Sequence, residues 1–216
     1  MRVTLLGPQR RPTLDTVAAS LYPEGPIATI TAGWRERESD DAEMSKLLGS
    51  RDVNLGLYRR WLDATERDPL FAAGERRLAE LLDQAADGYL LRLDHALQAQ
   101  FVTGRLAVIA WSAGAMALAD RIVLFHDRSP HGPGHPEVYG SGLGITRDVV
   151  LLPHARARLL LDDTARMAVF ARRFGPARCV LLEAGTRLEL SDAGAGLPPG
   201  TRVLAEDGHV ASLEAA

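Results

Sequence analysis

The fold is decided by the stretch Leu106-Ala-Val-Ile-Ala-Trp-Ser-Ala-Gly-Ala-Met-Ala-Leu-Ala119. Its first six residues form an apolar run typical of a buried strand, and the small residues that follow favour a helix. A serine at a direct strand-to-helix turn is a nucleophile elbow, which needs small neighbours so that the hydroxyl is lifted above the sheet edge. The first helical N–H groups, beginning at Ala113, would then face an oxyanion formed beside Ser112. An ordinary helix N-cap is the alternative interpretation of Ser112.

Strand patterns and helix patterns alternate on both sides of this stretch. They predict an α/β fold in which a parallel central sheet is flanked by helices and ends in antiparallel C-terminal edge strands. Residues 53–101 instead repeat apolar side chains at steps of three and four, which predicts an unusual helical block inside a single α/β domain of residues 1–216. The predicted strands are Val3–Leu6, Pro26–Thr31, Leu106–Trp111, Ile122–Phe125, Asp148–Pro153, Cys179–Leu182, Thr186–Leu190, Thr201–Ala205 and Val210–Leu213. The predicted helices outside the block lie from Pro12 to Leu21, from Glu43 to Leu48, after Ser112 and from Leu159 to Phe174.

Composition narrows the class of protein. The 216 residues are 46% hydrophobic and 25% charged, which is typical of a globular domain. A net charge of −3 argues against a protein that binds mainly nucleic acid or an anionic membrane. The first residues carry no long apolar run, and the sequence has no stretch long enough to span a membrane. We therefore expect a cytoplasmic protein.

Three motifs resemble one enzyme family. Trp111-Ser-Ala-Gly-Ala, Gly142-Leu-Gly-Ile and Leu151-Leu-Pro-His-Ala-Arg-Ala-Arg-Leu are similar to segments of the aspartyl dipeptidase and cyanophycinase family of serine peptidases. That family belongs to the class I glutamine-amidotransferase-like superfamily. The resemblance covers roughly residues 105–190 well, the first two predicted strands loosely and residues 53–101 not at all.

The resemblance implies roles for particular residues. Ser112 would be the nucleophile and His154, at the end of a predicted strand, the general base. The triad acid is either Asp127, in the loop after the elbow helix, or Glu183, one residue before the position expected from the family. The Gly-Gly-Asn-type loop that completes the family's oxyanion hole is absent, and Gly33 is the one substitute the sequence offers.

Further side chains are candidates for binding the substrate. Arg156 and Arg158 follow His154 and could hold a carboxylate through paired donors, unless they are simply solvated at a helix start. Trp111 beside the serine and Trp34 beside Gly33 are the aromatic candidates. The mixed charge run that begins at Arg35 is either a substrate contact or a solvated surface.

Metal and cofactor chemistry is not expected. His126, His131 and His135 cluster near Asp127, but their spacing matches no known metal site. Cys179 is the single cysteine and lies away from the elbow, which argues against glutamine amidotransfer and excludes an intrachain disulfide.

The leading hypothesis is therefore a serine hydrolase that cleaves amide bonds in small molecules or short peptides without a cofactor. One alternative is a catalytically inactive family member that acts as a binding or assembly module. Another is an esterase or acyl transferase built on the same elbow. The amphipathic block also suggests a homodimer interface.

Overall fold

The structure is a computed structural model, and its contacts divide the chain into two compact units. Unit 1 comprises Met1–Arg10 and Gln100–Ala216, and unit 2 comprises Arg11–Ala99. The structure describes residues 2–7, 13–21, 24, 27–56, 58–59, 62–63, 107–125, 136–190 and 196–214.

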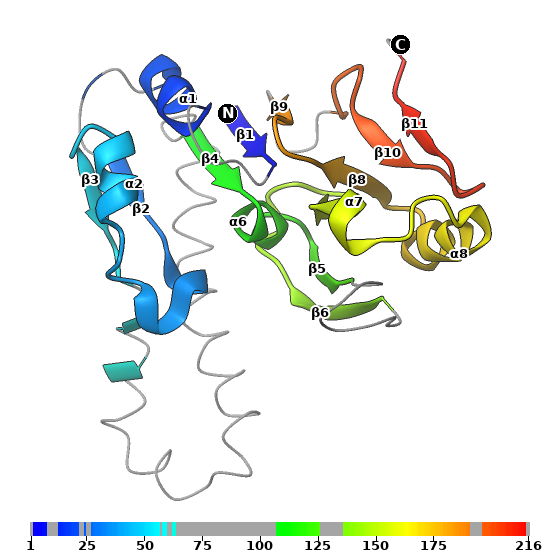
Figure 1. Cartoon of the computed structure of the whole chain (residues 1–216), viewed down its shortest axis with the longest axis horizontal. Coiled ribbons are helices and arrows are strands. Elements are labelled where there is room, and N and C mark those ends of the chain that lie inside the picture. Colours follow the sequence, from blue (N-terminus) through cyan, green and yellow to red (C-terminus); the bar gives the residue numbers. More distant parts are fainter. Residues whose placement is uncertain are drawn as a thin grey trace, which may run out of the picture. The chain divides into compact units, whose positions relative to one another are not determined.

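One sheet of unit 1 contains the first strand of the chain (Figure 1). In it β1 (Arg2–Leu6) pairs in parallel with β4 (Ala107–Trp111) and antiparallel with β9 (Arg187–Leu190). The described side chains of β1 are at most 1% exposed. Burial on both faces explains why Val3, Leu5 and Leu6 are apolar without the strict alternation of a half-exposed strand.

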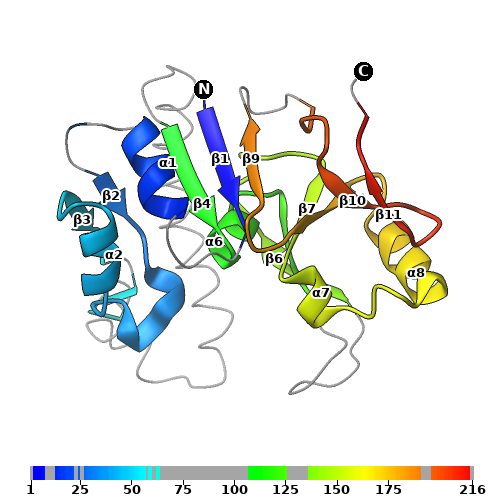
Figure 2. The same ribbon diagram turned by 45° about the horizontal axis from the view of Figure 1, so that its top comes forward.

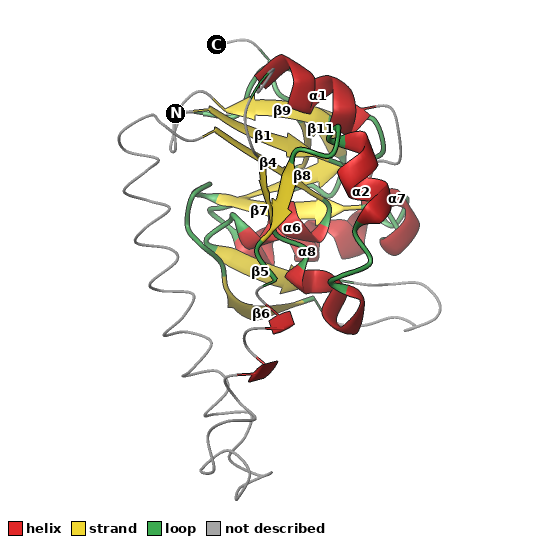
Figure 3. Ribbon diagram, turned by 90° about the vertical axis from the view of Figure 1, so that its left-hand side faces the viewer, coloured by secondary structure: helices red, strands yellow, loops and turns green. Residues whose placement is uncertain are grey.

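The second sheet of unit 1 has one parallel and two antiparallel strand pairs. β7 (Val149–Pro153) pairs in parallel with β8 (Arg178–Leu182), and every residue of β7 is buried. β10 (Arg202–Leu204) pairs antiparallel with β8, and β11 (Val210–Ser212) pairs antiparallel with β10. The antiparallel pairing predicted for the C-terminal strands is therefore confirmed, and Figure 1 shows β8, β10 and β11 side by side. Figure 3 labels β7, β8 and β11 of this sheet among the yellow strands.

The connection between β7 and β8 is helical, as a parallel pair requires. A single helix over Leu159–Phe174 was expected, but the structure has two, α7 (Ala155–Arg158) and α8 (Thr164–Phe174). α8 begins later because the Asp163 carboxylate accepts the Arg166 N–H at 3.0 Å and caps the helix there.

A two-stranded sheet follows the elbow helix α6 (Ala113–Ala117). It pairs β5 (Arg121–Leu124) antiparallel with β6 (Glu137–Ser141). The sequence did not predict β6, because most of this strand is exposed and lacks the apolar pattern of a buried strand.

Unit 2 pairs two short strands in parallel, β2 (Ile27–Thr29) and β3 (Asp52–Asn54). β3 overlaps the start of the predicted helical block, and residues 64–101 of that block lie outside the described residues. The dimer interface expected from it stays a prediction. Other described elements of unit 2 are the helix α1 (Thr13–Leu21), the helical turns η1 (Ala32–Arg37) and the helix α2 (Ala42–Leu47).

A mixed α/β fold with several small sheets is therefore confirmed. None of the described helices combines the length and the apolar character needed to cross a membrane.

Candidate active site

Ser112 lies at the turn between β4 and α6, where its backbone is strained. Its φ of 50° and ψ of −123° lie in a region that residues other than glycine rarely adopt. The Ser112 N–H donates to the Leu6 carbonyl at 3.1 Å, and its carbonyl accepts from Ala115 and Met116 at 3.1 and 3.3 Å. The residue is therefore held from both sides in this conformation.

The Ser112 hydroxyl does not cap the helix that follows it. The side chain makes no capping hydrogen bond to α6, and the residue is half-buried. Ser112 therefore occupies the N-cap position of α6 without capping the helix through its side chain. The positive φ explains why: a capping residue has β-region dihedrals, which aim its oxygen at the first helical N–H groups.

Small residues keep the space around the elbow open. Ala113 and Gly114 are exposed, and a side chain added at Gly114 would meet no atom within 4 Å. The N–H groups of a helix's first turn have no acceptor within the helix. Ala113 therefore has the position expected for an oxyanion donor.

His154 directly follows β7. Its φ of 57° and ψ of 35° are left-handed, and its N–H donates to the Leu182 carbonyl at 3.2 Å. Although the residue is largely exposed, partial burial of the imidazole lowers its pKa below the usual value. The Arg158 charge lowers the pKa further, while the Glu183 charge opposes both effects.

Glu183 follows β8, next to the end of β7, because Pro153 and Leu182 are partners in the parallel register. Its carboxylate Oε1 accepts the Arg156 N–H at 2.8 Å, in the first turn of the helix that begins after His154. The Glu183 N–H donates to the Thr186 hydroxyl at 3.1 Å. Glu183 thus fixes the helical turn that begins after His154. Its negative charge also favours the protonated form of the His154 imidazole. Asp127, the other candidate acid, lies outside the described residues.

Gly7 links the strand ends of the two larger sheets, a role that sequence reasoning missed. Its N–H donates to the Thr186 carbonyl at 3.0 Å. A Cβ placed on Gly7 would lie 1.8 Å from the Glu183 carbonyl oxygen, so only glycine allows this approach. Because Leu6 also accepts the Ser112 N–H, backbone contacts connect the turns of Ser112 and Glu183. Figure 2 shows α6 and α7 at the same end of unit 1. The sequence signal for the role of Gly7 was its position directly after the first predicted strand.

The Gly-Leu-Gly segment secures the elbow helix. The N–H groups of residues 142–146 donate to carbonyls of residues 117–120, at the end of α6, over 2.8 to 3.1 Å. An added Cβ on Gly142 would lie 2.0 Å from the Ala119 carbonyl oxygen. This segment therefore completes the C-terminal hydrogen bonds of the short helix that follows Ser112.

The candidate binding residues are divided between the units. In unit 1, Trp111 is half-buried, Arg156 is exposed, and the Arg158 guanidinium lies 5.5 Å from the centre of the Phe125 ring. The Arg158 position fits a cation–π contact. Gly33 and Trp34 lie in η1 of unit 2, so their proposed roles at Ser112 stay predictions.

The remaining reactive side chains do not form a site in the described part of the chain. Burial raises the pKa of the Cys179 thiol to about 12, so this cysteine is not an activated nucleophile. No three described His, Cys, Asp or Glu residues could hold a metal ion together. The cluster of His126, His131 and His135 lies outside the described residues.

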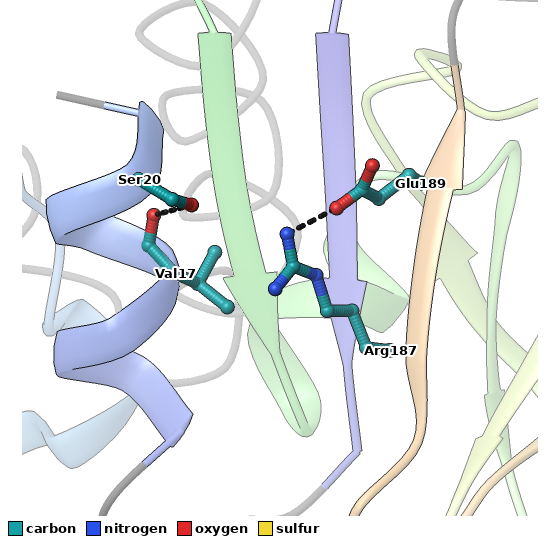
Figure 4. A network of polar contacts seen from close by, with 4 residues as sticks. All are labelled: Val17, Ser20, Arg187 and Glu189. Atoms are coloured by element: carbon teal, nitrogen blue, oxygen red, sulfur yellow. Dashed lines mark hydrogen bonds and ion pairs between the residues drawn. The ribbon is translucent and has the colours of Figure 1, made fainter.

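A separate hollow of about 540 Å³ lies beside β9 and β10. Arg187 and Glu189, which line it, form an ion pair with each other along β9 (Figure 4). Figure 4 also shows the Ser20 hydroxyl of unit 2 donating to the Val17 carbonyl at 2.9 Å within α1. Each contact joins two residues of the same element, the strand β9 or the helix α1.

Comparison with known proteins does not indicate a family for this chain. No protein-family model matches the sequence, and no curated protein is significantly similar to it.

Proposed function

We propose that this protein is a serine hydrolase that cleaves amide bonds in small substrates such as short peptides. The observation that carries the proposal is the backbone of Ser112, which is held at positive φ while its hydroxyl leaves the helix uncapped. Strain of this kind persists at sites where it serves a function.

The proposed reaction divides into two acyl transfers. Ser112 Oγ attacks the amide carbonyl while His154 takes the hydroxyl proton, and the resulting oxyanion is stabilised by the Ala113 N–H. The C–N bond then breaks, and His154 returns the proton to the leaving amine. Water, deprotonated by His154, hydrolyses the acyl-enzyme and regenerates Ser112. The reaction needs no cofactor.

Glu183 is the better supported triad acid. It follows the strand next to His154 and its charge favours the imidazolium, the form that the acid must stabilise. Its hydrogen bond to the Arg156 N–H also fixes the helix that begins after His154.

The proposal extends to the family and the fold. We regard the chain as a divergent relative of the aspartyl dipeptidases and cyanophycinases, acting in the cytoplasm. In this view the pair of β1 and β4 and the pair of β7 and β8, which lie in two separate sheets, correspond to two parts of the family's parallel central sheet flanked by helices. The parallel registers of β1 with β4 and of β7 with β8 support this arrangement.

The test is labelling with a fluorophosphonate, which reacts with activated serines. We expect wild-type protein to be labelled, Ser112→Ala to be unlabelled and His154→Ala to be labelled at least about a hundredfold more slowly. Ser141→Ala is the matched control, because Ser141 is an exposed serine of unit 1 and should leave labelling unchanged.

A parallel assay compares Asp-Xaa dipeptides with simple esters. Cleavage of dipeptides that is lost in Ser112→Ala supports the peptidase. Cleavage of esters alone would indicate the esterase. A wild-type protein that neither reacts with the probe nor cleaves any substrate would overturn the proposal in favour of the binding module.

A further inference from the structure

The strand β9 lies at the edge of its sheet in the described part of unit 1. It pairs with β1 on one side, and it is the last strand in the order β4-β1-β9. An edge strand leaves a row of backbone N–H and C=O groups without strand partners, and such a row can pair with another chain. The register between β1 and β9 determines which groups of β9 are left in this way.

The unpaired backbone groups of β9 belong to Arg187 and Glu189. Opposite residues of an antiparallel pair alternate between exchanging two backbone hydrogen bonds and exchanging none. The Leu6 carbonyl accepts the Ser112 N–H at 3.1 Å, so Leu6 faces β4 and makes no backbone hydrogen bond with Arg187, its register partner. Glu189, two residues further along β9, occupies the next position of the same kind. The N–H and C=O groups of Arg187 and Glu189 therefore point away from β1.

The hollow of about 540 Å³ lies along this free edge of β9. Its described lining combines residues 186–189 with residues of β8 and β10 and includes none of β1. Leu181 and Leu188, which are 1% and 7% exposed, give it an apolar side together with Pro198. The volume is within the usual range of ligand sites. The hollow therefore joins backbone groups that can pair with a strand to an apolar surface that can hold a side chain.

The charges around the hollow leave one arginine without a partner. Arg187 and Glu189 form an ion pair with each other, and Figure 4 shows both side chains directed from β9 toward β1. Arg202 also lines the hollow and is half-buried, and no carboxylate of the described residues forms an ion pair with it. A guanidinium offers two parallel donors that match a carboxylate. The hollow therefore favours a ligand that carries a carboxylate.

We propose that this hollow binds an extended peptide as an added strand beside β9. The peptide backbone pairs with the free N–H and C=O groups of Arg187 and Glu189. An apolar side chain of the peptide packs against Leu181 and Leu188. A peptide carboxylate, at the C-terminus or on an acidic side chain, binds Arg202. The proposal does not depend on the hydrolase activity, because none of the lining residues is a candidate catalytic residue.

The test titrates the full-length protein with acetyl-Val-Leu-Val, which has a free C-terminal carboxylate, and follows backbone amide NMR shifts. The amides of residues 186–189 and 200–202 should shift with a dissociation constant of about 0.1–1 mM. Methylation of the peptide's backbone nitrogens removes its strand donors and should weaken binding by about tenfold or more. Acetyl-Val-Leu-Val amide, which is uncharged, should also bind more weakly. Acetyl-Asp-Leu-Val amide tests whether a side-chain carboxylate can replace the C-terminal one.

Glu189→Pro tests the strand pairing directly. Proline is tolerated on an edge strand where the lost N–H faces away from the sheet, so the pairing with β1 should be kept. Peptide binding should weaken by about tenfold, because the peptide carbonyl loses its donor. Glu189→Ala is the matched control, since it keeps the N–H, and it should bind like wild type. If Glu189→Pro lowers the melting temperature, Arg187→Pro, at the first residue of the strand, tests the same edge.

Arg202→Gln tests the carboxylate contact. It should weaken the binding of the acidic peptides to the level of the uncharged amide and leave the binding of that amide unchanged. Arg178→Gln is the matched control, because Arg178 is an exposed arginine of β8 that does not line the hollow. Ser112→Ala should bind the peptides like wild type, which separates this site from the proposed active site.

Several results would overturn the proposal. The first is a wild-type protein that shows no shifts up to about 10 mM acetyl-Val-Leu-Val. The second is an N-methylated peptide that binds as tightly as the unmodified one, and the third is a Glu189→Ala variant that binds as weakly as Glu189→Pro. Equal binding of the uncharged amide and both acidic peptides would remove the role of Arg202. Butyrate that binds as tightly as acetyl-Val-Leu-Val would also contradict the proposal, because a lone carboxylate needs no strand pairing.

Discussion

At the scale of single residues, the backbone of Ser112 gives the sharpest prediction. Ser112→Ala keeps the strained positive φ, whereas Ser112→Gly removes the steric cause of the strain. We expect the glycine variant to be more stable than the alanine variant by about 1–2 kcal/mol, despite glycine's larger entropy loss on folding. Urea unfolding of the two variants measures the difference. An alanine variant of equal or greater stability would show that the backbone at this residue is not strained.

The sequence located this serine but could not determine its conformation. An apolar run followed by small residues predicts a strand-to-helix turn, and both a nucleophile and an N-cap fit that pattern. The choice depends on φ and ψ at Ser112, which are set by contacts with Leu6 and with the α6 backbone. Leu6 is more than a hundred residues earlier in the chain, so local pattern carries no information about this contact.

His154 gives a pH-dependent prediction with opposite signs for two variants. Partial burial holds the pKa of His154 below its ordinary value, which favours the neutral imidazole over the range of about pH 5 to pH 8 in which histidine side chains titrate. Removing the Arg158 charge with Arg158→Gln should raise the pKa. Removing the Glu183 charge with Glu183→Gln should lower it further, and the glutamine can still accept the Arg156 N–H.

The imidazole proton signals of His154, followed by NMR across this pH range, measure both shifts. His154→Ala identifies the His154 signals, because among the six histidines only the signals of residue 154 disappear in that variant. Shifts of the same sign in Arg158→Gln and Glu183→Gln would contradict the electrostatic account. If His154 is the general base, the acid limb of any hydrolase activity should move in the same direction as the pKa.

At the scale of elements, the Gly-Leu-Gly segment controls the helix that follows Ser112. Gly142→Ala places a Cβ 2.0 Å from the Ala119 carbonyl oxygen, so either the segment or the end of α6 must move. We expect a loss of stability of about 1–3 kcal/mol and slower fluorophosphonate labelling of Ser112. Gly140→Ala is the matched control, because a Cβ at Gly140 meets no atom within 4 Å. Equal behaviour of the two variants in both assays would remove the segment's positioning role.

Sequence patterns predicted those elements whose side chains are buried. β1, β7 and β8 are mainly apolar because neighbouring structure buries most of their side chains, and each was expected within one or two residues of its observed bounds. β4 was expected equally closely from its apolar residues, although most of its described side chains are only half-buried. β6 escaped prediction because Val138 and Tyr139 are 50% and 68% exposed and the strand lacks a buried face. It is held mainly by its pairing with β5, a long-range property that its own residues do not encode.

At the scale of the whole molecule, the candidate catalytic residues depend on contacts between sheets. Ser112 follows a strand of one sheet, and His154 and Glu183 follow strands of the other. The sequence predicted that each residue follows a strand, which is where α/β proteins place their sites. It could not predict how the two sheets meet, because contacts such as the close approach of the Gly7 and Glu183 backbones join residues far apart in the chain.

Gly7→Ala tests whether this contact holds the two halves of the candidate site together. The added Cβ would lie 1.8 Å from the Glu183 carbonyl oxygen, and backbone atoms on both sides leave no flexible side chain to move aside. The end of β1 should therefore shift relative to the Glu183 turn, which disturbs Ser112 and His154 together. We expect a destabilisation of about 2 kcal/mol or more, slower labelling of Ser112 and a changed His154 imidazole signal in the same variant. Gly196→Ala, at a glycine where a Cβ meets no atom within 4 Å, should change none of the three. A Gly7→Ala protein with lower stability but unaltered Ser112 reactivity and His154 signal would show that the contact supports the fold without aligning the site.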